Sequence, residues 1–116
     1  MRLRPITAAA LAVAAVFTSL ALAARGAAAQ EIAAGKRKAT ACQTCHGLDG
    51  IAKLPDAPHL AAQPAPYLER ELRAYRAGTR RNEVMSVAAK GLSDQDIRDL
   101  SAYYSAVQIE VKAVPQ

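Results

Sequence analysis

Metal-ligating side chains are scarce in this sequence. Its 116 residues contain two cysteines, two histidines and two methionines, one of which is the initial Met1. A closed zinc site needs four ligands in tetrahedral reach, and the available cysteines and histidines are Cys42, Cys45, His46 and His59. Because Cys45 and His46 are adjacent, a closed tetrahedral site is awkward to build from them. The scarcity argues against a structural zinc protein.

Strand patterns are also missing, since no segment alternates convincingly between apolar and polar residues. A thioredoxin-like C-x-x-C site needs a βαβ setting, so that kind of redox site is disfavoured. A structural disulfide between Cys42 and Cys45 stays open for an exported chain, but it would leave two long loops unexplained. We therefore expect an all-α fold.

Charge is absent from residues 6–24, which are rich in alanine, leucine and valine. Arg2 and Arg4 precede this stretch, and the small residues 27–29 follow it, in the A-x-A pattern of a cleavage site before Gln30. The pattern predicts a cleaved secretory signal peptide over residues 1–29 and a mature domain over 30–116, exported to a bacterial periplasm. A second candidate cleavage site lies at residues 21–23, and an uncleaved membrane anchor is the alternative.

The formal net charge of +5 shrinks when the signal peptide is removed. Arg2, Arg4 and Arg25 leave with it, so that 12 basic residues face 10 acidic ones. Nucleic acid binding would need a dense basic face, so this balance argues against it. The remaining 87 residues form one small domain, whose core needs help from a metal or a cross-link.

Residues 42–46 read Cys-Gln-Thr-Cys-His, the C-x-x-C-H pattern for covalent attachment of a c-type haem. Two thiols three residues apart on one helical turn can each add to a vinyl group of the same porphyrin. The imidazole of His46 is then held beneath the iron as its proximal ligand. The pattern predicts one covalent haem c bound through Cys42, Cys45 and His46.

Three helices are predicted, over residues 32–44, over 66–77 and from Ser93 onward. Gly47 and Gly78 are suited to end the first two, and the stretch 93–96 resembles a capping box. Residues 48–63 and 82–91 are predicted as irregular loops. A long loop in a small domain is unusual unless it covers something.

The first of these loops could cover one face of the haem with Ile51, Leu54 and Leu60. Pro58 lacks an N–H but keeps its carbonyl, which could accept a hydrogen bond from the second ring nitrogen of His46. Spacing alone favours an ordinary rigid turn at Pro58.

Met85 is the favoured sixth ligand of the iron, because it is the one methionine of the mature domain and lies between two predicted helices. Its soft thioether favours reduced iron. His59 offers a bis-histidine alternative, although a solvated loop histidine is the simpler reading. An open sixth position is the third possibility.

Arginines are dense in the second predicted helix and just after it. A run of this kind is usually a solvated face, but one or two arginines, or Asn82, could meet a haem propionate. The arginines are Arg70, Arg73, Arg76, Arg80 and Arg81.

With these motifs in place, the chain resembles the class I c-type cytochromes, within them the small bacterial group that includes cytochrome c-553 and cytochrome c4. The resemblance covers nearly all of the mature domain. It rests on Gly35 seven residues before Cys42, and on the stretches 42–47, 58–64, 67–68, 75–85, 92–97 and 102–104.

The resemblance implies a cytochrome c-like fold with three main helices and long loops around one haem. It implies that Gly35 lets the first helix cross the last one near residues 100–104. It also implies that the Pro58 carbonyl holds His46, that Leu60 packs on the haem and that Met85 is the distal ligand. Cytochrome c4 has two tandem haem domains, whereas this chain has one motif. Ala62 stands where that group often has glycine.

The expected function is one-electron transfer in a periplasmic or respiratory chain, without enzymatic activity of its own. Its partners would be cytochrome reductase or oxidase complexes, or an exported dehydrogenase, docking transiently. Membrane attachment is expected only if the N-terminal segment stays uncleaved. The alternatives are a dedicated haem subunit of an exported oxidoreductase, and a haem protein whose open or labile sixth site binds gas or peroxide.

Overall fold

The computed structural model describes residues 6–115, with side chains placed for residue 21 and from residue 23 onward. The basic start of the predicted signal peptide, residues 1–5, lies outside the described residues. Contacts divide the chain into two units, Met1–Gln30 and Glu31–Gln116. Helix α1, Ile6–Lys38, begins in the first unit and ends in the second. Within residues 6–115, no helix has both the length and the apolar character needed to cross a membrane.

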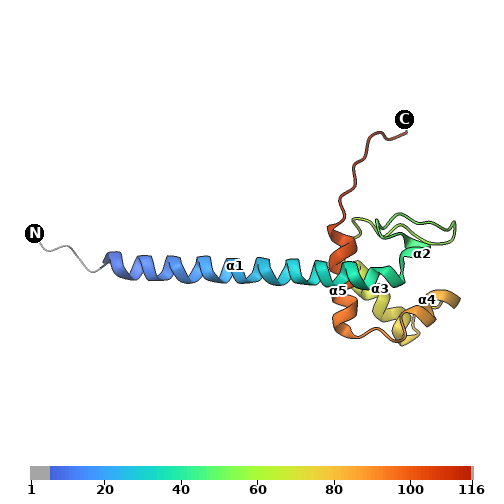
Figure 1. Ribbon diagram of the computed structural model, residues 1–116, viewed down its shortest axis with the longest axis horizontal. Helices are drawn as coiled ribbons and strands as arrows, with labels where there is room; N and C mark the ends of the chain where they lie inside the picture. The colour runs from blue at the N-terminus through green and yellow to red at the C-terminus, as the bar shows by residue number, and fades with distance from the viewer. Residues whose placement is uncertain (1–5, 116) are drawn as a thin grey trace, which may run out of the picture. The chain divides into compact units, whose positions relative to one another are not determined.

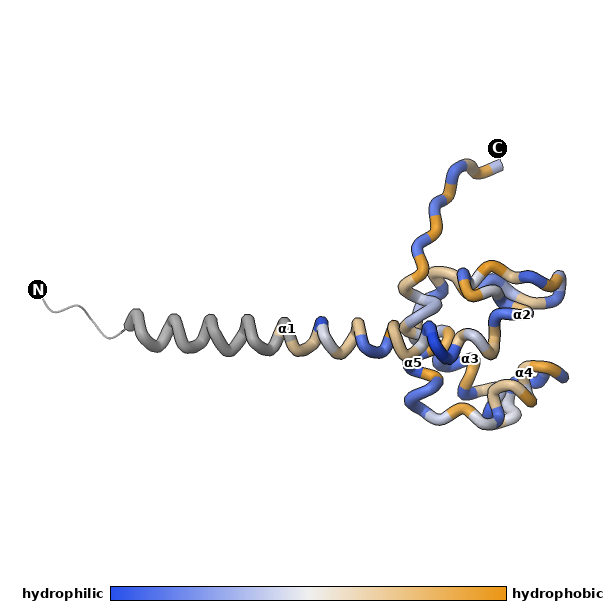
Figure 2. The backbone as a smooth tube through the Cα atoms, viewed as in Figure 1, coloured by the Kyte–Doolittle hydropathy of each residue, from blue (hydrophilic) through white to orange (hydrophobic). Residues whose placement is uncertain are grey.

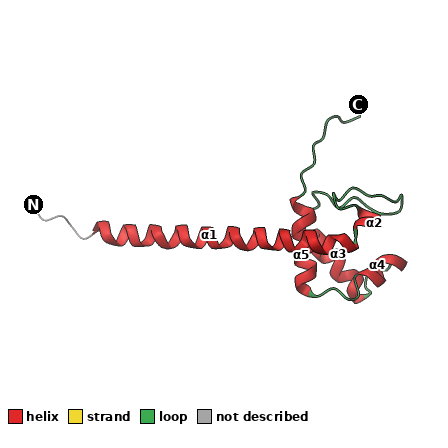
Figure 3. Ribbon diagram, in the orientation of Figure 1, coloured by secondary structure: helices red, strands yellow, loops and turns green. Residues whose placement is uncertain are grey.

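The second unit is helical, and no strand occurs in the described part of the chain (Figures 1 and 3). After α1 come the short 3-10 helix η1 (Ala39–Ala41) and α2 (Gln43–His46). The remaining elements are α3 (Ala65–Ala77), α4 (Glu83–Ala88) and α5 (Asp94–Ala106). The all-α prediction is confirmed.

Several predicted boundaries differ from the observed ones. The single helix expected over 32–44 is instead the end of α1, which begins at Ile6, followed by η1 and α2, with Cys42 at the N-cap of α2. The loop expected over 82–91 is wrong in its first half, because α4 lies there. The side chain of Asn82 caps α4 by accepting hydrogen bonds from the backbone N–H groups of Val84 (3.0 Å) and Met85 (2.9 Å). Asparagine followed by an acid is a helix-start signal in the sequence.

The helix ends follow the sequence signals elsewhere. Gly78 ends α3 in the left-handed conformation, and Gly47 ends α2 with a φ of 72°. Ser93 and Asp96 form a reciprocal capping box at the start of α5.

A small core joins these helices. Its buried members are Ala39 of η1, Leu68 of α3, and Leu100 and Tyr104 of α5. Cys42, Leu60 and other partly buried apolar side chains pack against this cluster. The core therefore ties α3 and α5 to the segment that carries the C-x-x-C-H motif.

Gly35 of α1 lies directly against α5. A Cβ atom at this position would overlap the backbone carbonyl of Asp99 and the Cβ of Tyr103. Only glycine lets the two helices approach so closely. The expected packing role of Gly35 is confirmed, with its contact beginning one residue before the stretch 100–104.

An ion pair stabilises the same crossing. Lys38 of α1 binds the carboxylates of Asp96 (2.7 Å) and Asp99 of α5, and the Asp99 side chain is only 4% exposed. Burial alone would raise the pKa of Asp99, but hydrogen bonds from Lys38 and Gln95 outweigh it and lower that pKa below its ordinary value.

Replacing this lysine tests the pair by pH dependence. With a lowered pKa in the folded state, ionised Asp99 stabilises the protein above the unfolded-state pKa of about 3.9 and loses this effect as the pH falls through the folded-state value. We expect Lys38→Gln to lower the urea midpoint of the mature holoprotein at pH 7. The difference in urea midpoint between the parent and Lys38→Gln should become smaller toward pH 4. In the variant, Asp99 has lost its cation and becomes protonated, and the neutral carboxyl group needs no charged partner. Lys36→Gln, an exposed position on the same helix, is the matched control. A difference independent of pH would contradict the pairing.

Ala62 is the only non-glycine residue with positive φ (58°) in the described part of the chain. This is where glycine often stands in the resembling group, and the turn keeps the left-handed backbone with alanine. Its N–H donates to the Tyr104 carbonyl at 3.0 Å, which holds it in place.

Ala62→Gly should therefore stabilise the protein. The left-handed backbone conformation destabilises a residue that has a Cβ by ~1–2 kcal/mol. Glycine removes this strain, but it also increases the conformational entropy of the unfolded chain, which offsets part of the gain. We expect the free energy of unfolding to rise by about 0.5–1 kcal/mol in urea titrations of the holoprotein. Ala61→Gly, at the buried neighbour, should destabilise it instead. Equal effects of the two changes would count against the strain at Ala62.

Candidate haem site

The two cysteines lie on a single short turn. The Cys42 carbonyl accepts from the N–H groups of Cys45 (3.3 Å) and His46 (3.0 Å), which closes the turn. Side chains at positions i and i+3 of a helix share one face, so the two sulfur atoms lie on the same side. Both thiols are free and partly buried. Burial, with a smaller effect from Cys45, raises the pKa of the Cys42 thiol.

His46 ends this turn as a buried residue, 6% exposed. Its Nδ1 atom lies 2.9 Å from the Pro58 carbonyl oxygen. Because a carbonyl can only accept, Nδ1 carries the proton and donates. The lone pair of the neutral ring is then on Nε2, which is the tautomer that binds a metal through Nε2. The structure thus contains the hydrogen bond that spacing alone did not favour.

The path of the loop 47–64 brings Pro58 back to His46. Gly47 and Gly50 both have positive φ, and the Gly50 carbonyl accepts from the N–H groups of Leu60 (2.7 Å) and Ala61 (3.1 Å). The Lys53 N–H donates to the Cys45 carbonyl at 2.8 Å. These bonds fold the loop against α2.

Apolar side chains of this loop differ in burial. Leu60 is partly buried and packs against the core cluster, whereas Ile51 and Leu54 are 40% and 48% exposed. Figure 2 shows apolar segments both in this loop and in α4. Apolar residues are therefore present on the loop that carries Pro58 and on α4, which carries Met85.

His59, the alternative sixth ligand, has another role in the loop. It is exposed, and its Nδ1 accepts a hydrogen bond from the Ala52 N–H at 2.8 Å. With Nδ1 as the acceptor, the proton of the neutral ring sits on Nε2, so neither nitrogen offers a free lone pair. This contact favours a loop-stabilising histidine over a metal ligand.

Met85 occupies the third position of α4 and is partly buried. The Asn82 cap fixes the first turn of α4 and with it the backbone of Met85. Its neighbours Val84 and Val87 are strongly exposed, at 63% and 75%.

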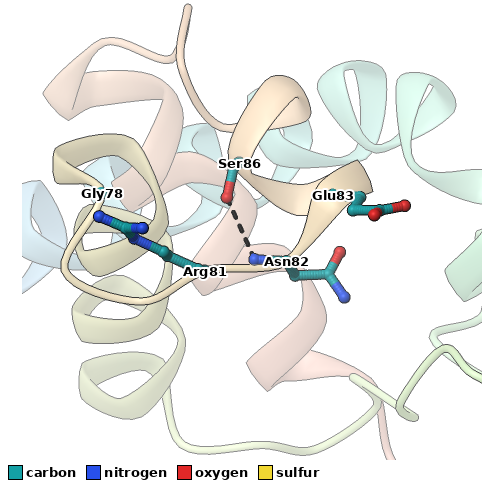
Figure 4. Close-up of a pocket in the computed structure, with 5 residues that line it drawn as sticks. All are labelled: Gly78, Arg81, Asn82, Glu83 and Ser86. Atoms are coloured by element: carbon teal, nitrogen blue, oxygen red, sulfur yellow. Dashed lines mark hydrogen bonds between the residues drawn. The ribbon is translucent and has the colours of Figure 1, made fainter.

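An open depression of about 580 Å³ lies beside the start of α4 (Figure 4). Arg81 and Glu83 are among the residues that line it, and the Asn82 N–H donates to Ser86 Oγ at 3.2 Å. Neither the two cysteines nor His46 nor Met85 lines it.

Most of the arginines expected to form a solvated face are paired within the chain. Arg73 (2.7 Å) and Arg76 (2.6 Å) of α3 both bind Asp94 of α5, and they lower the pKa of that carboxyl, Arg76 by the larger amount. Arg70 and Arg80 both contact Glu71. Asn82 is occupied as the α4 cap. The positive charge of α3 is thus partly neutralised, and two of the ion pairs join α3 to α5.

Tyr103 and Tyr104 of α5 are not among the site residues predicted from the sequence. In the structure the Tyr103 hydroxyl donates to the Leu48 carbonyl (2.7 Å) and the Tyr104 hydroxyl to the Gly47 carbonyl (3.2 Å). A buried tyrosine usually finds a partner for its hydroxyl, and this was the signal available in the sequence.

The donor set fits a covalently attached metal macrocycle better than a bare ion. Within the described residues, no group of three or more His, Cys, Asp and Glu side chains could hold a metal ion. What the site offers is two thiols on one turn and one buried imidazole with a free Nε2. These are the groups that the predicted haem c requires.

Comparisons with known proteins agree with this chemistry. The family model described as cytochrome c matches residues 32–108. Cytochrome c-554(548) of Halomonas halodenitrificans is 46% identical over 81 residues, covering 67% of this chain and 98% of that protein. A thiosulfate dehydrogenase electron acceptor of Thiomonas intermedia is 40% identical over 85 residues, covering 72% of this chain and 39% of that one.

A solved structure is also similar. Reduced cytochrome c4 from Pseudomonas stutzeri superposes with a TM-score of 0.61 at 36% identity, over 65% of this chain and 44% of that chain. This chain therefore spans less than half of that cytochrome c4. The fold is that of cytochrome c, the cofactor is covalently bound haem c, and the chain belongs to the cytochrome c family.

Proposed function

We propose that this monohaem cytochrome c carries single electrons between exported redox proteins, with His46 and Met85 as the axial ligands. The observation that carries the proposal is the buried His46, whose Nδ1–H is held by the Pro58 carbonyl 2.9 Å away on the turn that bears both cysteines. The bound haem supplies a one-electron Fe(III)/Fe(II) couple.

Each residue of the turn has a separate task. Cys42 and Cys45 provide the thioether sulfurs, and His46 presents Nε2. Pro58 fixes the orientation of the imidazole and increases its basicity, since a hydrogen-bonded Nδ1–H gives the ring more negative character. Leu60, packed against the core beneath the same loop, keeps water away from this side.

Met85 would supply the opposite ligand from the first turn of α4. Its neutral, soft thioether favours reduced iron, which raises the reduction potential. With both axial positions filled by protein, no position is left for a substrate. Electron transfer without bond making is the chemistry that suits such a site.

The N-terminal segment and one relative support the proposed location and partners. The charge-free stretch 6–24 and the A-x-A pattern at 27–29 support a cleaved signal peptide over 1–29 and a haem domain over 30–116 in the periplasm. Similarity to a thiosulfate dehydrogenase electron acceptor supports an exported dehydrogenase as the electron donor. A respiratory oxidase complex would be the acceptor, and docking would be transient.

The same relative supports a second candidate, a dedicated haem subunit of one exported oxidoreductase. Size-exclusion chromatography of periplasmic extract separates the two functions. A carrier elutes as a small protein, whereas a dedicated subunit elutes with its enzyme.

Cleavage of the signal peptide is tested by mass spectrometry of the protein purified from the periplasm. We expect a chain that starts at Gln30 and carries the additional mass of one haem. Recovery of the intact chain from the membrane fraction would contradict cleavage and support the uncleaved anchor.

Met85→Ala tests the distal ligand. We expect the ferric spectrum to lose the weak red band of a methionine–iron bond and to become high-spin. The reduction potential should fall by on the order of 100 mV, within the ~0.8 V range over which axial ligands set haem potentials. Val87→Ala, at an exposed position on the same short helix, is the control and should change neither property. An unaltered spectrum in Met85→Ala would remove Met85 from the site.

A further inference from the structure

Two adjacent tyrosines of α5 hold the backbone that follows His46. The hydroxyl of Tyr103 donates to the Leu48 carbonyl at 2.7 Å, and the hydroxyl of Tyr104 donates to the Gly47 carbonyl at 3.2 Å. We call this pair the tyrosine clamp. It reaches across 55 and 57 residues of sequence to the two positions directly after the proximal histidine.

Carbonyls at a helix C-terminus lack partners within the helix, and the end of α2 is such a place. The Gly47 N–H donates to the Gln43 carbonyl, and the Gly47 carbonyl accepts from the Gly50 N–H at 3.2 Å within the loop. The Tyr104 hydroxyl is a second donor to this carbonyl, and it comes from the buried core, where Tyr104 is 3% exposed. Burial also raises the pKa of Tyr104, so its hydroxyl stays protonated as a donor even in alkaline solution.

The backbone of Tyr104 holds the other end of the same loop. Its carbonyl lies in the last turn of α5 and accepts the Ala62 N–H at 3.0 Å. Tyr104 thus binds residue 47 through its side chain and residue 62 through its main chain. Pro58, whose carbonyl accepts from His46, lies within the segment closed in this way.

Packing around the clamp restricts its motion. The two tyrosine rings lie 5.2 Å apart at a tilt of 56°, an arrangement in which aromatic rings attract each other. Tyr104 also belongs to the core cluster against which Cys42 packs. The clamp is therefore connected to the haem-attachment turn from both sides, through Cys42 and through Gly47.

We propose that the tyrosine clamp positions His46: it fixes the loop that presents the Pro58 carbonyl, and so sets the strength of the His46–Pro58 hydrogen bond and the reduction potential. This rests on the proposed function, in which His46 is an axial ligand. Tyr103 and Tyr104 act through the backbone, as positioning residues. A looser loop would weaken the hydrogen bond, make the imidazole less basic and stabilise ferric iron less.

The test uses the mature holoprotein with Tyr104→Phe, Tyr103→Phe and the double change. Phenylalanine keeps the ring packing and removes only the hydroxyl. Tyr75→Phe is the matched control, because Tyr75 belongs to α3 and its ring packs under the Arg80 guanidinium. Two readouts are followed, the reduction potential by mediated titration and the exchange rate of the His46 Nδ1–H proton by NMR.

We expect the Nδ1–H proton to exchange roughly five- to tenfold faster in Tyr104→Phe. The loss of one hydrogen bond makes local opening of the loop easier by about this factor. The reduction potential should rise in each clamp variant and most in the double variant. Tyr75→Phe should match the parent in both readouts.

If the clamp serves stability alone, its variants will have a lower urea midpoint but the same exchange rate and reduction potential as the parent. This result would overturn the proposal. If Tyr104→Phe does not fold, Tyr103→Phe decides the question, because its half-buried side chain tolerates the loss of a hydroxyl better. Failure of the proposed function would appear separately, as a parent protein without the spectrum of histidine and methionine ligation. A normal parent with unchanged clamp variants refutes the clamp only.

Discussion

The hydrogen bond from His46 Nδ1 to the Pro58 carbonyl is the contact on which the site depends. It fixes the tautomer of a buried imidazole, and it requires a loop that leaves α2, turns at Gly47 and Gly50 and returns twelve residues later. Backbone hydrogen bonds within the loop meet the second requirement. The bonds from Leu60 and Ala61 to Gly50 close the loop, and Lys53 bonds back to Cys45.

The helical scaffold is small, so it relies on a few close and specific contacts. Gly35 allows α1 to approach the backbone of α5, and Lys38 adds a charged contact at the same crossing. Asp94 joins α3 to α5 by accepting from Arg73 and Arg76. Since α5 also supplies the tyrosine clamp, hydrogen bonds connect α5 directly to the loop that follows His46.

Two arginines of the basic helix α3 are neutralised by Asp94 of α5, so these charges stabilise the contact between the two helices. Exposed apolar residues lie on α4, such as Val84 and Val87, and on the loop 47–64. A redox partner that docks there would meet apolar groups as well as charge.

The sequence by itself determined the haem-attachment turn, the helix caps and the fold class, because these depend on residues within a few positions of one another. Two cysteines three apart share a helix face in any context, and Ser93 caps α5 through Asp96 alone. The sequence did not predict the break before Cys42, nor the Asn82 cap that makes α4 a helix. Only the tertiary structure decided that Pro58 accepts from His46, that Asp94 takes two arginines and that Tyr103 and Tyr104 hold residues 47 and 48. These contacts join distant parts of the chain, and their geometry is fixed by packing that no local pattern encodes.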